Sequence, residues 1–115
     1  MPVRVVTDST CDLPSDLVRE LNITVVPLTV VFGEESFRDG VDIDSTTFFD
    51  RLSQAKDLPR TSQPSVEAFR EAYAAAGSDA SDVVSIHISA RLSGTINAAS
   101  IAREEMAPGL HIDLI

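Results

Sequence analysis

Four short apolar runs along the chain have the length and composition of β-strands, and helical segments separate them. Val or Ile recurs in each run, and apolar runs of about four to eight residues bounded by polar loops are typical of buried strands. A further apolar run, Leu28 to Phe32, follows Pro27, which cannot donate to a sheet ladder and therefore belongs at an edge or a bend. The four strands are expected at residues 3–6, 23–26, 82–88 and 110–115.

Between these runs the apolar residues recur with the period of an α-helix. Ser65, and Asp44 or Ser45, stand where a side-chain oxygen can cap a first turn, and Gly77 is expected at the C′ position of its helix. Gly33 opens a predicted tight turn into a hairpin arm at residues 36–38. Helices are expected to begin at Asp12, with Pro14 in the first turn, at Asp44 or Ser45, at Ser65, and near Ile96.

Alternation of strands and helices implies right-handed βαβ units. The predicted fold class is therefore α/β, with an open, mainly parallel sheet and helices on both faces. At 115 residues and 43% apolar composition, residues 1–115 fit a single domain. The sequence ends inside an apolar strand, so we expect the domain to be truncated.

The charge and the cysteine content of the chain argue against several classes of function. Nine basic and eighteen acidic residues give a net charge of −9, which disfavours binding to nucleic acid or to an anionic membrane surface. The single cysteine, Cys11, cannot form an internal disulfide. Apolar runs fall well short of the ~20 residues that span a bilayer. We therefore expect a cytoplasmic protein without membrane insertion.

Two hydroxyl-rich segments stand directly before predicted helices. The first is a predicted loop containing Thr61 and Ser62, and the second contains Ser93, Gly94 and Thr95. Helix starts present unpaired N–H groups and the positive end of the helix dipole, which favour an anion. The Ser93 hydroxyl and the N–H groups of Gly94 and Thr95 suit one carboxylate oxygen, and Thr61 and Ser62 suit the other. Helix capping by Ser93 and Thr95, and a simple turn at Thr61–Ser62, are the alternatives, and the residues alone leave the choice even.

Other polar residues have structural explanations that outweigh chemical ones. Asp8 follows a strand and suits a phosphoacceptor, a metal ligand or a base, but an Asx-type turn or helix cap is favoured. His87 lies on a predicted central strand and is interpreted as a structural imidazole with satisfied hydrogen bonds. Arg60 and Arg91 precede the hydroxyl segments and suit either charge neutralisation or simple solvation. Turn and cap roles are expected for Asp39, Asp42 and Asp44, and His111 has no partner at metal-ligand spacing.

The chain contains no P-loop, dinucleotide-binding glycine motif or defensible Ser-His-Asp set. We therefore predict no catalytic residue, no metal and no cofactor. An enzyme alternative remains, namely a doubly wound phosphotransferase domain with Asp8 or Ser93 as acceptor. A protein-interaction domain is a second alternative.

Several motifs, taken in order, resemble the N-terminal half of DegV family proteins, from residue 3 to the end. The paired TSQPS and LSGT segments are the most distinctive of them. The resembling motifs are Val6-Thr7-Asp8-Ser9-Thr10, Val26-Pro27-Leu28, Arg60-Thr61-Ser62-Gln63-Pro64-Ser65, Ile88-Ser89 and Leu92-Ser93-Gly94-Thr95.

This resemblance implies fatty acid binding, with the carboxylate on the hydroxyls of Thr61 and Ser93 and the tail in an apolar tunnel. Ser62 and Gly94 carry over with them as ligand-binding residues. Arg60, Thr95 and Ile96 are expected beside the ligand, and residues 26–32 along the tail. Asp8 and Ser9 are expected to have a structural or interface role.

The family also implies a partner, since some members carry the lipid for a bacterial fatty acid kinase and present it to a separate ATP-binding subunit. Family members are more than twice as long and have a second, lipid-enclosing domain, which is absent from this sequence. Its absence is expected to expose apolar surface and so to favour self-association.

Overall fold

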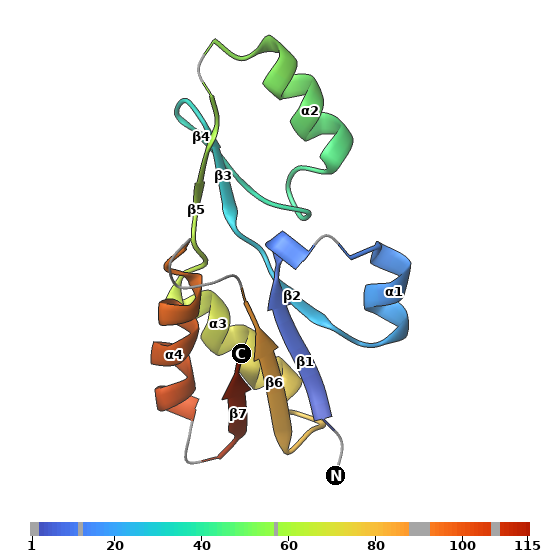
Figure 1. The fold of residues 1–115 in the computed structure, drawn as a ribbon, viewed down its shortest axis with the longest axis vertical. Coiled ribbons are helices and arrows are strands. Elements are labelled where there is room, and N and C mark those ends of the chain that lie inside the picture. The colour runs from blue at the N-terminus through green and yellow to red at the C-terminus, as the bar shows by residue number, and fades with distance from the viewer. Residues whose placement is uncertain (1–2, 12, 57, 88–92, 107–108) are drawn as a thin grey trace.

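The computed structural model describes residues 3–11, 13–56, 58–87, 93–106 and 109–115. A parallel sheet with strand order β2-β1-β6-β7 occupies the lower part of Figure 1. It confirms the mainly parallel α/β sheet, because its four strands coincide with the four predicted runs to within two residues. They are β1 (Val3–Asp8), β2 (Thr24–Val26), β6 (Asp82–Ile86) and β7 (His111–Leu114).

Helices lie on both sides of this sheet, as predicted. In Figure 1, α3 and α4 lie together on one side, and α1 stands on the other side of β1 and β2. α1 begins at Ser15 with Pro14 as its N-cap, so Pro14 lies just before the first turn in which it was expected, and Asp12 lies outside the described residues. The helical elements are η1 (Ser9–Cys11), α1 (Ser15–Glu20), α2 (Ser45–Gln54), α3 (Val66–Ala76) and α4 (Thr95–Met106).

Two of the predicted caps are confirmed, and one helix end differs. Asp44 accepts a hydrogen bond from the Thr47 N–H at 2.7 Å, and Ser65 accepts one from the Ala68 N–H at 3.0 Å. Gly77 is the C-cap of α3, one position before the expected C′ residue, and its φ is −75°. A Cβ at Gly77 would lie 3.0 Å from Leu110 Cδ2, so Leu110 would have to shift slightly to admit one.

The main core fills the space between the parallel sheet and the helices α3 and α4. Phe69 and Tyr73 of α3 are fully buried and pack with alternate strand residues such as Val6 and Val83. α4 contributes small side chains, including the fully buried Ala99, which allow it to lie close to α3. This core holds α3 and α4 firmly against the sheet.

A second, antiparallel sheet extends above the first, and the sequence did not predict it as a sheet. Its order is β4-β3-β5, and Gly33 makes the expected tight turn between β3 and β4 with φ 61°. The predicted loop at Thr61 and Ser62 is wrong, since both belong to β5. All β5 residues are polar and exposed, so no apolar alternation marks them. The strands are β3 (Thr29–Phe32), β4 (Glu35–Arg38) and β5 (Arg60–Ser62).

Aromatic side chains attach α2 to this second sheet. The ring centroids of Phe32 in β3 and Phe48 in α2 lie 5.7 Å apart. The Arg51 guanidinium lies 4.6 Å from the centroid of the Phe37 ring, at cation–π distance. The second sheet and α2 thus form a small unit with its own apolar contacts, joined to the parallel sheet at the carboxyl ends of β1 and β2 (Figure 1).

Among the residues that the structure describes, no helix has the length and apolar character needed to cross a bilayer.

Candidate functional site

Ser93 and Gly94 form the start of α4. The Ser93 Oγ accepts a hydrogen bond from the Thr95 N–H at 3.2 Å and lies 2.8 Å from the Thr95 Oγ1. The Gly94 carbonyl accepts the backbone N–H groups of Asn97 and Ala98, so Gly94 begins the helical hydrogen bonding. Ser93 therefore makes the capping contact expected under the alternative interpretation. Its hydroxyl and the Gly94 backbone remain partly exposed at the helix start.

Thr61 and Ser62 present exposed side chains from β5. Their positions in the antiparallel ladder pair with Val30 and Thr29 of β3. Because the ladder fixes the backbone of both residues, the hydroxyl groups are the parts free to meet a ligand. Ser62 is the β5 residue nearest the parallel sheet, since its partner Thr29 begins β3.

The structure brings these two hydroxyl segments together through Gln63 and Gly94. A Cβ at Gly94 would overlap the Gln63 carboxamide, with Cδ 2.8 Å and Nε2 3.1 Å away. With any larger residue at Gly94, the Gln63 side chain would have to move aside. Ser65 then caps α3, which packs along α4. Gln63, just after β5, therefore lies against Gly94 at the start of α4.

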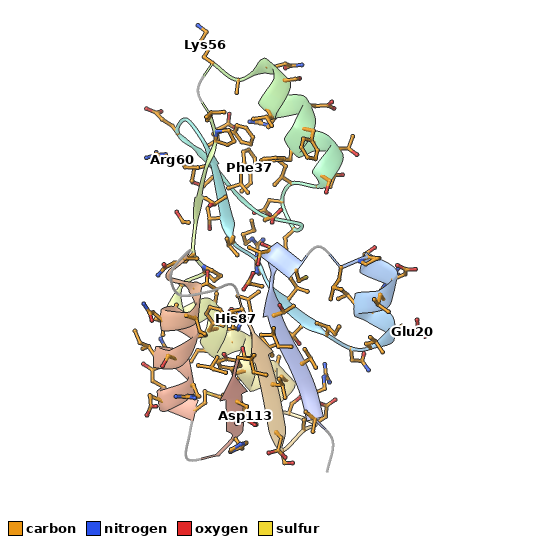
Figure 2. The ribbon with its side chains drawn as sticks, in the orientation of Figure 1. Glu20, Phe37, Lys56, Arg60, His87 and Asp113 are labelled. Carbon is orange, nitrogen blue, oxygen red and sulfur yellow. The ribbon has the colours of Figure 1, made fainter. Side chains whose placement is uncertain are left out.

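Residues expected beside the ligand fall at different distances from this surface. Arg60 lies two positions outward along β5, paired with Val31, and Figure 2 shows it well away from His87. Thr95 is fully buried and its N–H donates to Ser93, so it does not point outward as expected. Ile96 is half-buried in the first turn of α4. Arg91, and the motif residues Ile88, Ser89 and Leu92, lie outside the described residues.

Three of residues 26–32 are buried within the domain, and the expected role of this segment along the tail stays a prediction. Val26 belongs to the core against α3, and Leu28 and Val30 are at most 8% exposed. Their side chains are therefore occupied by packing within the protein.

Asp8 is fully buried at the end of β1 and makes the Asx-type turn that the sequence favours. Its Oδ1 accepts the Thr10 N–H at 2.9 Å and also contacts the Thr10 hydroxyl, while its Oδ2 lies 2.7 Å from His87 Nδ1. Burial alone raises the pKa of this carboxyl, but the hydrogen bonds from His87 and Thr10 outweigh burial and hold it below its ordinary value. Asp8 is therefore an ionised, fully engaged carboxylate.

His87 has partners on both ring nitrogens, which confirms the structural interpretation of this residue. Its Nε2 bonds the Ser85 hydroxyl, which in turn lies 2.8 Å from the Tyr73 hydroxyl. Burial raises the pKa of Tyr73, although the Ser85 hydrogen bond partly opposes this effect. The side chains of His87 and Asp8 have no exposed surface, and Figure 2 shows His87 inside the fold.

The remaining acidic and histidine residues have the expected structural roles. Asp42 pairs with Arg38 at 3.1 Å, Asp44 caps α2, and His111 lies 3.2 Å from Asp113 on the surface. The described part of the chain holds no cluster of three metal-binding side chains.

Comparison with known proteins identifies the family. The sequence profile described as "Uncharacterised protein, DegV family" matches residues 2–115. The chain belongs to the DegV family. The chain is 39% identical to the DegV domain-containing protein CPE0304 of Clostridium perfringens, in an alignment that covers 100% of this chain and 41% of the relative.

Solved structures of DegV proteins share this fold along the whole chain. A DegV family protein from Thermus thermophilus, described as fatty acid binding, is 41% identical with a TM-score of 0.87, covering 100% of this chain and 40% of that one. A stearic acid-binding protein from Eubacterium ventriosum is 34% identical with a TM-score of 0.90, covering 99% and 41%. The chain thus spans about two-fifths of the length of these relatives.

Three contacts of this DegV domain, Gln63 with Gly94 among them, were missed in the sequence. Gln63 follows Thr61 and Ser62 in the TSQPS motif, and that adjacency is the signal that could have marked it. The pairing of Tyr73 with Ser85, and of Asp8 with His87, joins residues from different elements, for which one sequence offers no local pattern.

Proposed function

We propose that this DegV domain binds a long-chain fatty acid through its carboxylate. Thr61 and Ser62 would donate their hydroxyls from β5, and Ser93 and Gly94 would donate from the start of α4. The observation that supports the proposal is the close approach of the Gln63 side chain to Gly94, because Gln63 adjoins Thr61 and Ser62 in sequence and Gly94 adjoins Ser93. Relatives of 34% and 41% identity that are described as binding fatty acids support the same ligand.

The chemistry of this surface suits a carboxylate better than a neutral group. A carboxylate has two oxygens and about four acceptor positions, which the proposed donors, three hydroxyls and a backbone N–H, would fill. The start of α4 adds the positive end of a 12-residue helix dipole. Local donors must supply this attraction, since the net charge of −9 repels an anion at long range. Ile96, partly exposed in the first turn of α4, would contact the first methylene groups of the tail.

Transfer of phosphate by Asp8 finds no support in the geometry. The carboxylate of Asp8 is fully buried, and both of its oxygens are engaged by Thr10 and His87. A phosphoacceptor needs an approachable oxygen, so we propose a binding protein rather than an enzyme. Presentation of the bound acid to a separate ATP-binding kinase subunit is a further part of this proposal, and it rests on the resemblance alone.

Calorimetric titration with oleate and methyl oleate tests the proposal. The two ligands share a tail and differ in the charge that the hydroxyls would hold. We expect Ser93→Ala and Thr61→Ala each to weaken oleate binding by roughly 1–3 kcal/mol, the cost of losing a hydrogen bond to a charged group.

The matched control is Ser78→Ala, which removes a hydroxyl that bonds the Ala75 carbonyl at 2.8 Å at the far end of α3. This control should leave binding unchanged. Equal affinity of the unsubstituted protein for oleate and its methyl ester would contradict the carboxylate assignment.

A further inference from the structure

β1 ends in a short turn that contacts two other parts of the molecule at once. On one side, Asp8 accepts a hydrogen bond from His87 at the end of β6, at 2.7 Å. On the other side, the Ser9 Oγ accepts the backbone N–H of Leu28, between β2 and β3, at 3.0 Å. Thr10 closes the turn by donating its N–H to Asp8. One turn therefore ties the parallel sheet to the start of the antiparallel sheet.

The Ser9 contact connects β1 to the strand pair that includes Thr61 and Ser62. Leu28 immediately precedes β3, and its carbonyl also accepts the Asp39 N–H at 2.8 Å, so both backbone groups of Leu28 are fixed. The next residue, Thr29, is the register partner of Ser62 in β5. A shift of Leu28 relative to β1 would therefore move the end of β5, and with it the hydroxyls of the proposed site.

The Asp8–His87 contact connects β1 to α3, which packs along α4. His87 packs edge-on against the Phe69 ring of α3, with centroids 5.1 Å apart and an interplanar angle of 88°. Through Ser85 it also reaches the hydroxyl of Tyr73, one turn further along α3. Since α3 packs along α4, this network sets the position of α4 relative to β1.

The direction of one hydrogen bond in this network follows from Asp8, because an ionised carboxylate can only accept, so His87 Nδ1 carries a proton and donates it. On the other side of the ring, His87 Nε2 bonds the Ser85 hydroxyl, which in turn bonds the Tyr73 hydroxyl. Each of these side-chain polar atoms has a partner inside the fold, which favours a defined geometry for the network.

We propose that Ser9, Asp8 and His87 are positioning residues that hold the end of β5 and the start of α4 at the separation a carboxylate requires. This inference rests on the proposed function. Asp8 and His87 have no exposed side-chain surface, so they act through the elements they join rather than by touching the acid. Ser9 acts through Leu28.

The first arm of the test compares oleate with methyl oleate in Ser9→Ala, Ser9→Thr and the control Ser78→Ala. Loss of the Ser9 hydroxyl should weaken oleate binding about five- to tenfold and leave methyl oleate binding unchanged. Ser9→Thr keeps an oxygen acceptor for the Leu28 N–H and should restore the preference for the acid. An equal loss for both ligands in Ser9→Ala indicates general destabilisation and would overturn the inference.

The second arm needs no ligand and separates this inference from the proposed function. In amide NMR spectra of the ligand-free protein, Ser9→Ala should move the resonances of Thr61 and Ser62, whereas Ser78→Ala should not. If the unsubstituted protein fails to prefer oleate over its ester, the proposed function fails, and these resonances still decide the positioning role. Unchanged resonances at both positions would overturn the inference.

A third arm monitors the buried hydrogen-bond network through the fluorescence of Tyr73, the only tyrosine in a protein without tryptophan. His87→Gln should change the tyrosine fluorescence, because it disturbs the Ser85 hydroxyl that Tyr73 contacts. The matched control is His111→Gln, which alters an exposed imidazole on β7 and should leave the emission unchanged. If His87→Gln and His111→Gln have identical emission, His87 does not act through Tyr73, and the positioning role of His87 is overturned. The Ser9→Ala measurements then test the positioning role of Ser9 separately.

Discussion

Replacement of Gly94 by alanine tests how the two donor segments meet. The added methyl group would overlap the Gln63 carboxamide, whose Cδ lies 2.8 Å from the Cβ position. Gln63 is exposed, so its side chain can rotate away. The substitution therefore perturbs the contact between the segments without entering the core.

The expected effects on folding and on binding differ in size. Overpacking a core costs about 1–3 kcal/mol, but a mobile surface side chain relieves most of that. Replacing glycine also gains about 0.4–1 kcal/mol by restricting the unfolded chain. We therefore expect the free energy of unfolding of Gly94→Ala to stay within about 1 kcal/mol of the original. Alanine keeps the backbone N–H of residue 94, so affinity should fall through displacement of the segment after β5. A displacement that breaks one hydrogen bond to the carboxylate costs about 1.5–3 kcal/mol, or roughly ten- to a hundredfold in affinity.

Chemical denaturation and calorimetry with oleate measure these two quantities on the same samples. The matched control is Gly109→Ala, where a Cβ would meet nothing within 4 Å. Adding Gln63→Ala to Gly94→Ala gives the methyl group room and should recover part of the lost affinity. Oleate affinity in Gly94→Ala equal to that of the control would refute the view that this contact assembles the site.

Three further predictions concern groups whose surroundings are defined. The hydrogen bonds to Asp8 hold its pKa below the ordinary 3.8, so its contribution to stability is present above that pH and is lost as the pH falls through the folded value. Asp8→Asn should reduce the fall in the free energy of unfolding at acid pH, measured by denaturation at a series of pH values. Burial raises the pKa of Tyr73 above 10.0, so stability should fall as the pH rises past 10.0, and phenolate absorbance should appear together with unfolding. Ser65→Ala removes the cap of α3 and should lower the free energy of unfolding by about 1 kcal/mol in urea titrations.

Elements with strong local patterns could be predicted from the sequence. The four strands of the parallel sheet are short apolar runs, and the caps Asp44 and Ser65 are the expected residue types at helix starts. These features depend on neighbours along the chain, which a single sequence displays.

The antiparallel sheet could not be predicted in the same way. β5 has only three residues, all exposed, and it is held by pairing with β3 rather than by burial. The Asp8–His87 contact joins residues 79 positions apart, and neither residue carries a local sign of the other. The close approach of Gly77 to Leu110 shows the same limit, because it joins two distant residues and leaves no mark in the local sequence.

The most direct test of fatty acid binding is native mass spectrometry of the purified protein, with solvent extraction to identify any lipid released. The account predicts an adduct with the mass of a fatty acid, present in the unsubstituted protein or formed with oleate, and lost in Ser93→Ala. A bare protein mass in the presence of excess oleate, or an adduct that forms equally with methyl oleate, would contradict it.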